Sequence, residues 1–231
     1  SATRTVEIQS GTIDIALGLL QTDVPVLEEN PDVNIIRSVG VGNTWIGFNC
    51  NAEPFTDARV RQAVAYAIDK EAIVDAVYGG VGEVATGPIP SSVWGYTDET
   101  VDYGYNPEKA VELLTEAGYP DGFATEMKIS NTQVRVDIAE IVKQYLAEVG
   151  IDMTITTLEN ATYLDDVQAQ DLEMFILGWE TTTLDADYGL YEPYHSGMPT
   201  WANTTGYSNP EVDRLLDEAR VCLDETERAR S

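Results

Sequence analysis

Few residues of this chain have the types and spacing that enzymatic chemistry needs. Asp185 and Asp187 are two carboxylates close in sequence, as in a glycosidase pair, but such neighbours arise by chance among 40 acidic residues. His195 is the only histidine and a poor basis for a transition-metal site, although a metal that arrives chelated needs only one protein ligand. The sequence has no Gly-x-Ser-x-Gly, phosphate-binding glycine loop or His-Glu-x-x-His. We therefore expect no enzyme and no resident cofactor or metal.

The two cysteines, Cys50 and Cys222, are far apart in sequence and form no Cys-x-x-Cys motif. This spacing argues against a zinc site or a dithiol redox centre. Cys50 follows a strand-like segment and Cys222 lies in a predicted helix, so we expect two buried thiols. A disulfide between them stays open, since the sequence does not give their distance.

The best candidate for a binding site is the segment 178–188, which follows the continuous apolar run 174–177. Such a run predicts a short, central strand, and ligands of open α/β sheets bind beyond the carboxyl ends of strands. Trp179 offers a flat apolar surface and one N–H donor, suited to a peptide side chain or a sugar ring. The segment's other candidate ligand residues are Gly178, Glu180, Thr182, Asp185 and Asp187.

Two candidates lie outside this segment. Arg135 lies at the start of the predicted helix 134–149, where a guanidinium can bind a carboxylate bidentately and the helix N-terminus favours an anion. A surface ion pair is the alternative role for Arg135. Trp45, with Asn43 and Tyr96, is a weaker pocket candidate whose alternative role is packing.

Helical and strand periods alternate after residue 105 and predict an α/β domain. Asn106 and Pro107 begin a helix that Gly118 ends, and a second helix, 134–149, ends before Gly150. Residues 151–156 then alternate as in a strand with one buried face. Further predicted elements are strands at 33–39 and 44–49, helices at 59–68 and 71–78, and a helix after Asn209 with Val212, Leu215, Leu216 and Ala219 on one side.

Composition adds constraints on the class of protein. The 231 residues are 43% hydrophobic, enough for one substantial core, and no apolar run approaches the ~18 residues of a membrane helix. The formal charge of −27 repels nucleic acid and anionic lipid, so we expect no nucleic-acid partner. Acidic residues spread along the chain indicate an organism that lives in concentrated salt, where screening removes most of their repulsion.

One long motif resembles a known family. Residues 48–69 read FNCNAEPFTDARVRQAVAYAID, close to the F-N-x-x-x-x-P-F-x-D-x-R-V-R-x-A-x-x-Y-A-I-D pattern of family 5 solute-binding proteins. These are the oligopeptide, dipeptide and nickel receptors of ABC importers. Further matches are GPIP at 87–90, YNPEKA at 105–110 and GYSNPEVD at 206–213.

The resemblance implies a fragment of a two-lobed receptor. The implied fold is a type II periplasmic-binding-protein lobe, a mixed sheet flanked by helices. Residues 1–40 would form a crossover shared with a missing N-terminal half, and residues 41–231 the C-terminal ligand-binding lobe, truncated at its end. The implied receptor is extracytoplasmic and monomeric, meets the membrane only through a missing anchor, and docks on the transmembrane permease subunits.

The resemblance also frames the choice of ligand. In many peptide-binding members, an aspartate three residues after the tryptophan holds the ligand's ammonium group, whereas this chain has the neutral Thr182 there. Asp185 or Asp187 takes that role if the loop is shifted, and Arg135 lies near the position that binds the carboxylate in dipeptide receptors. A peptide is the leading candidate ligand, and an oligosaccharide or a metal chelate is the alternative within the same class of receptor. A glycoside hydrolase and a sensory ligand-binding domain are the rivals from other classes.

Overall fold

The computed structural model describes residues 2–19, 23–101 and 103–229, which fall into two compact units. The first unit comprises residues 1–39 and 71–84, and the second residues 40–70 and 85–231. Helices α1 (Ala2–Gln9), α2 (Val24–Glu28) and nearly all of α4 (Lys70–Tyr78) belong to the first unit. There Leu27 is fully buried, and the hydroxyl of Thr5 donates to Asp23 Oδ2 at 2.6 Å.

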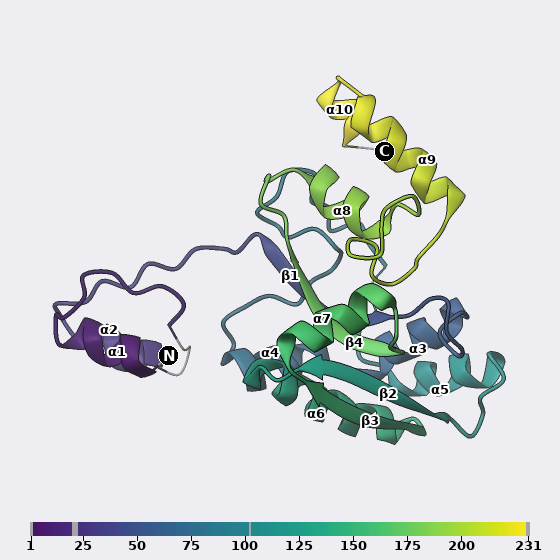
Figure 1. The fold of residues 1–231 in the computed structure, drawn as a ribbon, viewed down its shortest axis with the longest axis horizontal. Coiled ribbons are helices and arrows are strands. Elements are labelled where there is room, and N and C mark those ends of the chain that lie inside the picture. The colour runs from purple at the N-terminus through teal and green to yellow at the C-terminus, as the bar shows by residue number, and fades with distance from the viewer. Residues whose placement is uncertain (1, 20–22, 102, 230–231) are drawn as a thin grey trace. The chain divides into compact units, whose positions relative to one another are not determined.

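The second unit is built on a four-stranded sheet in the order β1-β4-β2-β3 (Figure 1). Its strands are β1 (Gly42–Phe48), β2 (Phe123–Ser130), β3 (Ile151–Leu158) and β4 (Met174–Glu180). Strand β2 runs parallel to β3 and β4, whereas β1 is antiparallel to β4. The sheet is therefore mixed, and the apolar run at the start of β4 is confirmed as an interior strand. The strands predicted at 44–49 and 151–156 are confirmed as β1 and β3.

Strand β1 forms one edge of this sheet. The N–H of Asn49 donates to the carbonyl of Glu173, and the N–H of Thr181 to the carbonyl of Val41, so the bonds to β4 fall at odd-numbered positions of β1. The backbone groups of Ile46 and its even-numbered neighbours therefore point away from β4. Among the described residues no further strand pairs with that side.

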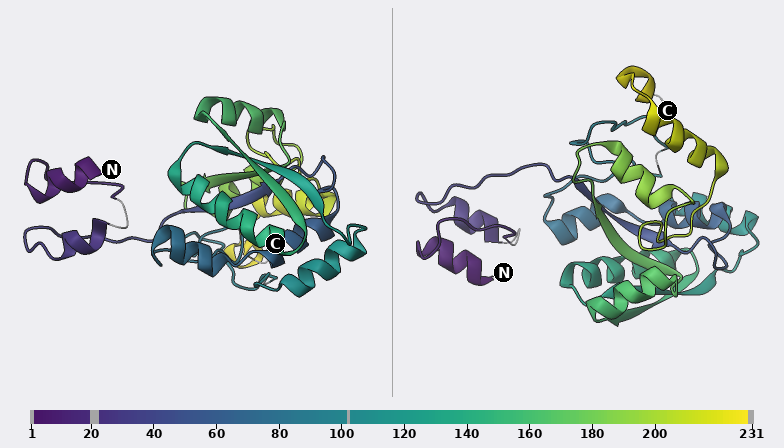
Figure 2. Two further views of the ribbon diagram at one scale, coloured as in Figure 1. Left: turned by 90° about the horizontal axis from the view of Figure 1, so that it is seen from below. Right: turned by 45° about the horizontal axis from the view of Figure 1, so that its top comes forward.

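Helices cover both faces of the sheet. Those of the second unit are α3 (Ala58–Ala67), α5 (Pro107–Glu116), α6 (Gln133–Glu148), α7 (Asn160–Ala169), α8 (Ala186–Tyr194), α9 (Pro210–Val221) and α10 (Glu225–Arg228). Figure 2 shows α6 and α7 on opposite sides of the strands, as two right-handed parallel crossovers in opposite directions require. With the mixed sheet between them, this is the predicted α/β lobe.

The predicted caps and stops form as expected. The Asn106 side chain accepts the N–H of Lys109, Pro107 is the first residue of α5, and Gly118 ends the helix with a φ of 96°. Helix α6 buries one stripe of apolar side chains against the sheet: Ile138, Ala139, Val142 and Leu146. The predicted helices at 59–68 and 71–78 are confirmed as α3 and α4.

One predicted strand is wrong. Residues 33–39 form no regular structure, and Ile36 is 84% exposed. Their apolar alternation favours a strand locally, but in the described part of the chain no strand lies beside them to share hydrogen bonds. Helix α9 forms where predicted, yet none of its residues is buried, so its apolar side is only partly covered.

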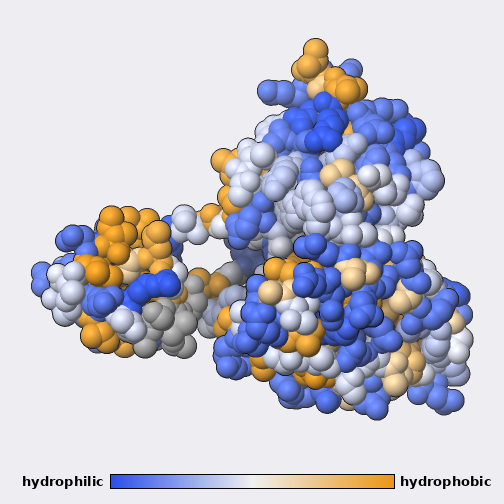
Figure 3. Space-filling view, in the orientation of Figure 1, coloured by the Kyte–Doolittle hydropathy of each residue, from blue (hydrophilic) through white to orange (hydrophobic). Residues whose placement is uncertain are grey.

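The surface reflects the acidic composition. Figure 3 shows hydrophilic residues over most of the visible face of the second unit, with hydrophobic residues gathered at the end of the chain around α10. Val221 and Leu223, which precede α10, are 77% and 99% exposed. Within the described residues, no helix is both long and apolar enough to cross a bilayer.

Candidate functional site

Three parallel strands end at the same edge of the sheet. Strand β2 ends at Ser130, β3 at Leu158 and β4 at Glu180, and each is followed by a helix, α6, α7 and α8 respectively. Helix N-termini and polar loop groups therefore collect at this edge, which is where open α/β sheets bind ligands. We call it the carboxyl edge.

Trp179 lies on β4 at the carboxyl edge, opposite Asn43 of β1. Its side chain is half-buried, and its ring packs at 5.3 Å against that of Tyr188 on α8. The indole Nε1 is buried and has no hydrogen-bond partner among the described residues. A buried donor without an acceptor carries a free-energy cost, which an acceptor on a bound molecule would remove.

The neighbours of Trp179 present polar groups to solvent. Gly178, Glu180 and Thr182 are all exposed, and Gly178 and Glu180 belong to the strand itself rather than to a loop. The carboxylate of Glu180 lies beside the backbone of Gly42, where a Cβ would come within 2.8 Å of Oε1. No ion pair within the described residues involves Glu180.

The loop proper is short and covers residues 181–185. Thr181 is buried, and its N–H donates to the carbonyl of Val41 at 2.8 Å. Leu184 has a φ of 59°, a left-handed conformation that costs a non-glycine residue about 1–2 kcal/mol. A short bridge holds this turn, since the Trp94 N–H donates to the Leu184 carbonyl and the Ala186 N–H donates to the Trp94 carbonyl.

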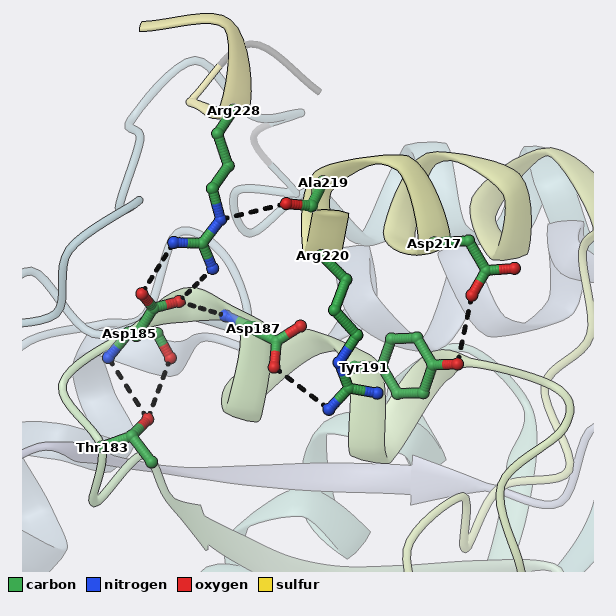
Figure 4. Close-up of polar contacts among 8 residues, drawn as sticks. All are labelled: Thr183, Asp185, Asp187, Tyr191, Asp217, Ala219, Arg220 and Arg228. Carbon is green, nitrogen blue, oxygen red and sulfur yellow. Dashed lines mark hydrogen bonds and ion pairs between the residues drawn. The ribbon is translucent and has the colours of Figure 1, made fainter. Parts of the chain in front are cut away.

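Asp185 and Asp187 are both engaged by arginines (Figure 4). Asp185 caps α8 by accepting the N–H of Asp187, and its two oxygens accept from Arg228 at 2.6 and 2.8 Å. The Arg228 guanidinium holds the pKa of Asp185 below its usual range, despite some desolvation. Asp187 pairs with Arg220 at 3.2 Å. The two carboxylates thus serve the start of α8 and its links to α9 and α10.

Arg135 lies in the first turn of α6, at the carboxyl edge. Its Nη1 donates to the hydroxyl of the buried Ser130 at 2.7 Å, and its guanidinium lies 5.2 Å from the centroid of the Tyr163 ring. Within the described residues no carboxylate pairs with it. The surface ion pair that was the alternative role for Arg135 does not form among them.

Trp45 lies on β1, two residues along from Asn43, the partner of Trp179. It pairs with Leu177 in the sheet and lines a cavity of about 560 Å³ between β1 and helices α8 and α9. The cavity walls are mostly apolar and include Leu190, Tyr194 and Leu215, and Arg61 and Cys50 also line it. Trp45 therefore borders a separate space, and Asn43, the other β1 candidate, donates to the carbonyls of Gly87 and Pro88.

His195 is stacked on Tyr191 at 4.5 Å, and its Nδ1 accepts the N–H of Gly197. No group of three or more metal-ligating side chains forms among the described residues. Cys50 and Cys222 are both free thiols, each half-buried rather than buried, and burial raises the pKa of Cys50.

Sequence reasoning did not find Tyr163, Trp94 or Arg228. Tyr163 is fully buried beneath Arg135, in a cluster with Val167, Leu172 and Phe175. Trp94 and Arg228 reach the loop from segments 91 and 43 residues away along the chain, so local periodicity could not place them.

Three comparisons relate this geometry to known proteins. The model of bacterial extracellular solute-binding proteins, family 5, matches residues 1–200. Heme-binding protein A of Haemophilus influenzae is 36% identical over 100% of this chain and 43% of its own length. The glutathione-binding protein GsiB of Escherichia coli K12 is 32% identical over 99% of this chain and 46% of its own.

Solved structures agree. The periplasmic binding protein DppA of Helicobacter pylori, in complex with the peptide STSA, superposes with a TM-score of 0.90 at 30% identity, covering 100% of this chain and 45% of its own. The chain thus spans about half the length of the relatives it matches, which fits a fragment. The mixed sheet with its flanking helices is that of type II periplasmic binding proteins. The chain belongs to the bacterial extracellular solute-binding proteins of family 5, which are receptors and not enzymes.

Proposed function

We propose that this chain is the ligand-binding lobe of an extracytoplasmic receptor that binds a peptide and delivers it to an ABC permease. The observation that carries the proposal is Arg135, a guanidinium in the first turn of α6 with no carboxylate partner among the described residues. A ligand carboxylate placed there gains a charge-assisted hydrogen bond and the favourable potential of the helix N-terminus. Glutathione and peptides, named for relatives of this chain, both carry carboxylates.

The same edge offers groups for the rest of a peptide. Trp179 would wall the pocket over a side chain and donate its unsatisfied N–H to a peptide carbonyl. Glu180 would accept the ligand's ammonium group, because Thr182 is neutral and Asp185 and Asp187 already bind arginines. Direct contacts of the ligand with Gly178, Thr182 and Trp45 stay predictions.

An oligosaccharide is the second candidate within the receptor class. The observation that favours it is the exposed hydroxyl-bearing pair Thr182 and Thr183, three and four residues after Trp179, because sugars bind through aromatic faces and hydroxyl hydrogen bonds. A glycoside hydrolase is disfavoured by the family and by the arginines that occupy Asp185 and Asp187. A crossover role for residues 1–40, a monomeric state and a membrane anchor outside this sequence remain part of the proposal.

Calorimetric titration of the full-length receptor tests the ligand class. The probes are the peptide Ser-Thr-Ser-Ala, the same peptide with an amidated C-terminus, glutathione and maltotriose. We expect the free-acid peptide to bind at least tenfold more tightly than the amide, because the amide lacks the charge that Arg135 meets. If maltotriose is the only probe that binds, the ligand class is a sugar and not a peptide.

Variants assign the carboxylate to Arg135. Arg135→Ala should weaken the free-acid peptide by about 10- to 100-fold, the range for a hydrogen bond to a charged group, and leave the amide nearly unchanged. Lys143→Ala is the matched control, a cation removed from an exposed position on the same helix. An equal loss for acid and amide would contradict the assignment.

A further inference from the structure

We infer that Arg228 is a positioning residue for the ligand-facing loop, acting through Asp185 and Trp94. The inference rests on the proposed function in one respect, namely that the loop beside Trp179 meets the solute. We call these three residues the Arg228 clamp. None of them has to touch a ligand for the clamp to act.

The clamp holds a turn in which Leu184 has an unfavourable backbone conformation. Leu184 has a left-handed φ of 59°, and the residue is 53% exposed, so packing of its side chain contributes little to holding the turn. Non-glycine residues keep such a conformation only where their surroundings impose it. The restraint must therefore come from the residues on either side of Leu184 and from what they contact.

Arg228 contacts both halves of the bridge that flanks this residue. Its guanidinium binds the Asp185 carboxylate bidentately, at 2.6 and 2.8 Å, and lies 4.7 Å from the centroid of the Trp94 ring. Trp94 in turn is bonded through its backbone to Leu184 and Ala186. A planar guanidinium suits this double task, since it forks onto a carboxylate and stacks on an aromatic face at once.

The arginine is itself fixed in place. Its Nε donates to the carbonyl of Ala219 on α9 at 3.1 Å (Figure 4). Helix α10 is capped by Asp224, which accepts the N–H groups of Thr226 and Glu227. The Arg228 side chain is 22% exposed. The pair with Asp185 is therefore screened less by salt than the exposed ion pairs on α9.

A second contact from α9 reinforces the link. Arg220 pairs with Asp187, in the first turn of α8, and lies over the Tyr191 ring at 3.8 Å. The start of α8 is thus tied to the C-terminal segment at two successive acidic positions. Tyr188, one residue further along, packs on Trp179, so a displaced α8 start would displace the face of the proposed pocket.

The consequence is that residues after α9 tune binding at the carboxyl edge. If loss of Arg228 leaves the loop in its binding conformation only a tenth of the time, the apparent Kd rises about tenfold, because apparent affinity scales with the populated fraction. The loss of affinity comes from a change in loop population, with every direct contact still available. Arg228→Lys, which keeps the charge but cannot fork, should recover part of the affinity.

The test uses the full-length receptor and two readouts. Hydrogen exchange without ligand should be faster in Arg228→Ala at the amides of Leu184, Ala186 and Asp187, and unchanged in α6. Titration with Ser-Thr-Ser-Ala should show a Kd about tenfold higher. Arg214→Ala is the matched control, since among the described residues Arg214 on α9 pairs only with exposed Glu211 and Glu218 of its own helix, and the variant should change neither readout.

The outcomes separate this inference from the proposed function. Unchanged exchange in the loop of Arg228→Ala would overturn the clamp, whatever the ligand. A weaker affinity in Trp179→Ala together with an unaltered affinity in Arg228→Ala would also overturn it, with the site intact. If Ser-Thr-Ser-Ala does not bind the wild-type receptor, the peptide assignment fails, and the exchange experiment still decides the clamp.

Discussion

Removal of one buried hydroxyl should destabilise the lobe measurably. Tyr163 is fully buried, and its hydroxyl donates to the carbonyl of Ile176 at 2.6 Å. Strands β2 and β4 pair only as far as Lys128 and Phe175, so the Ile176 carbonyl lies just past the last ladder position. The phenol therefore supplies the donor that a neighbouring strand would otherwise give.

Tyr163→Phe leaves this carbonyl buried without that donor. The cost of such an unmade bond is about 1–3 kcal/mol, and we expect about 2 kcal/mol with little loss of packing. For a lobe of this size that lowers Tm by about 4–8 °C. Urea denaturation, monitored by tryptophan fluorescence, should show this loss of stability as a lower urea midpoint with an unchanged dependence of the unfolding free energy on urea.

The control is Tyr105→Phe, which removes a hydroxyl that bonds Glu148 at the surface and should cost less than about 0.5 kcal/mol. Equal costs for the two variants would refute the reasoning, because burial would then not set the value of the bond. A stability of Tyr163→Phe equal to that of wild type would refute it equally.

Three other predictions concern pH, backbone and salt. Burial raises the pKa of Tyr163 to about 12, above the value of ~10 in the unfolded chain, so the neutral phenol contributes its full stabilisation below pH ~10 and loses it as the pH rises toward 12. Urea titrations at a series of pH values should therefore show the difference in unfolding free energy between wild type and Tyr163→Phe narrowing over that window. Thermal unfolding should show that Gly122→Ala lowers the unfolding free energy by well over the ~1 kcal/mol expected for Gly118→Ala. Both glycines have a positive φ, but only at Gly122 would a Cβ come within 1.8 Å of the Gly150 carbonyl oxygen, so similar losses of stability in the two variants would contradict this. Raising NaCl from 0.1 to 1 M should raise Tm, since the screening length falls from about 10 to about 3 Å around a chain of charge −27, and a lower Tm would argue against a high-salt habitat.

Local signals were sufficient for most single elements. The caps at Asn106 and Asn209 and the stop at Gly118 act within one helical turn, so a single sequence window contains all the groups involved. The strand predicted at 33–39 is wrong for the opposite reason. A strand needs a neighbouring strand to share its hydrogen bonds, and a short stretch of sequence does not show whether such a neighbour exists.

The site divides in the same way. Trp179 could be placed at the carboxyl edge because it adjoins the end of a strand that the sequence indicates, whereas Arg135 follows β2, a strand that the sequence analysis did not predict. The roles of Asp185 and Asp187 could not be read, since an aspartate at a helix start looks the same with or without an arginine brought from a distant helix. Segment 178–188 was one loop in the sequence pattern, whereas the structure divides it into the end of β4, a tight turn held by the bridge to Trp94, and the start of α8.

The open side of β1 affects how this polypeptide behaves once purified. Backbone groups of Ile46 and Phe48 point toward the side where an apolar cavity separates β1 from α8 and α9 and where no described strand pairs with them, and a strand edge without a partner acts as a template for other chains. High concentration and added sulfate would both promote such stacking, whereas a proline at position 46 would remove the outward donor and block it. Expression as part of the complete receptor is the safer route to soluble material.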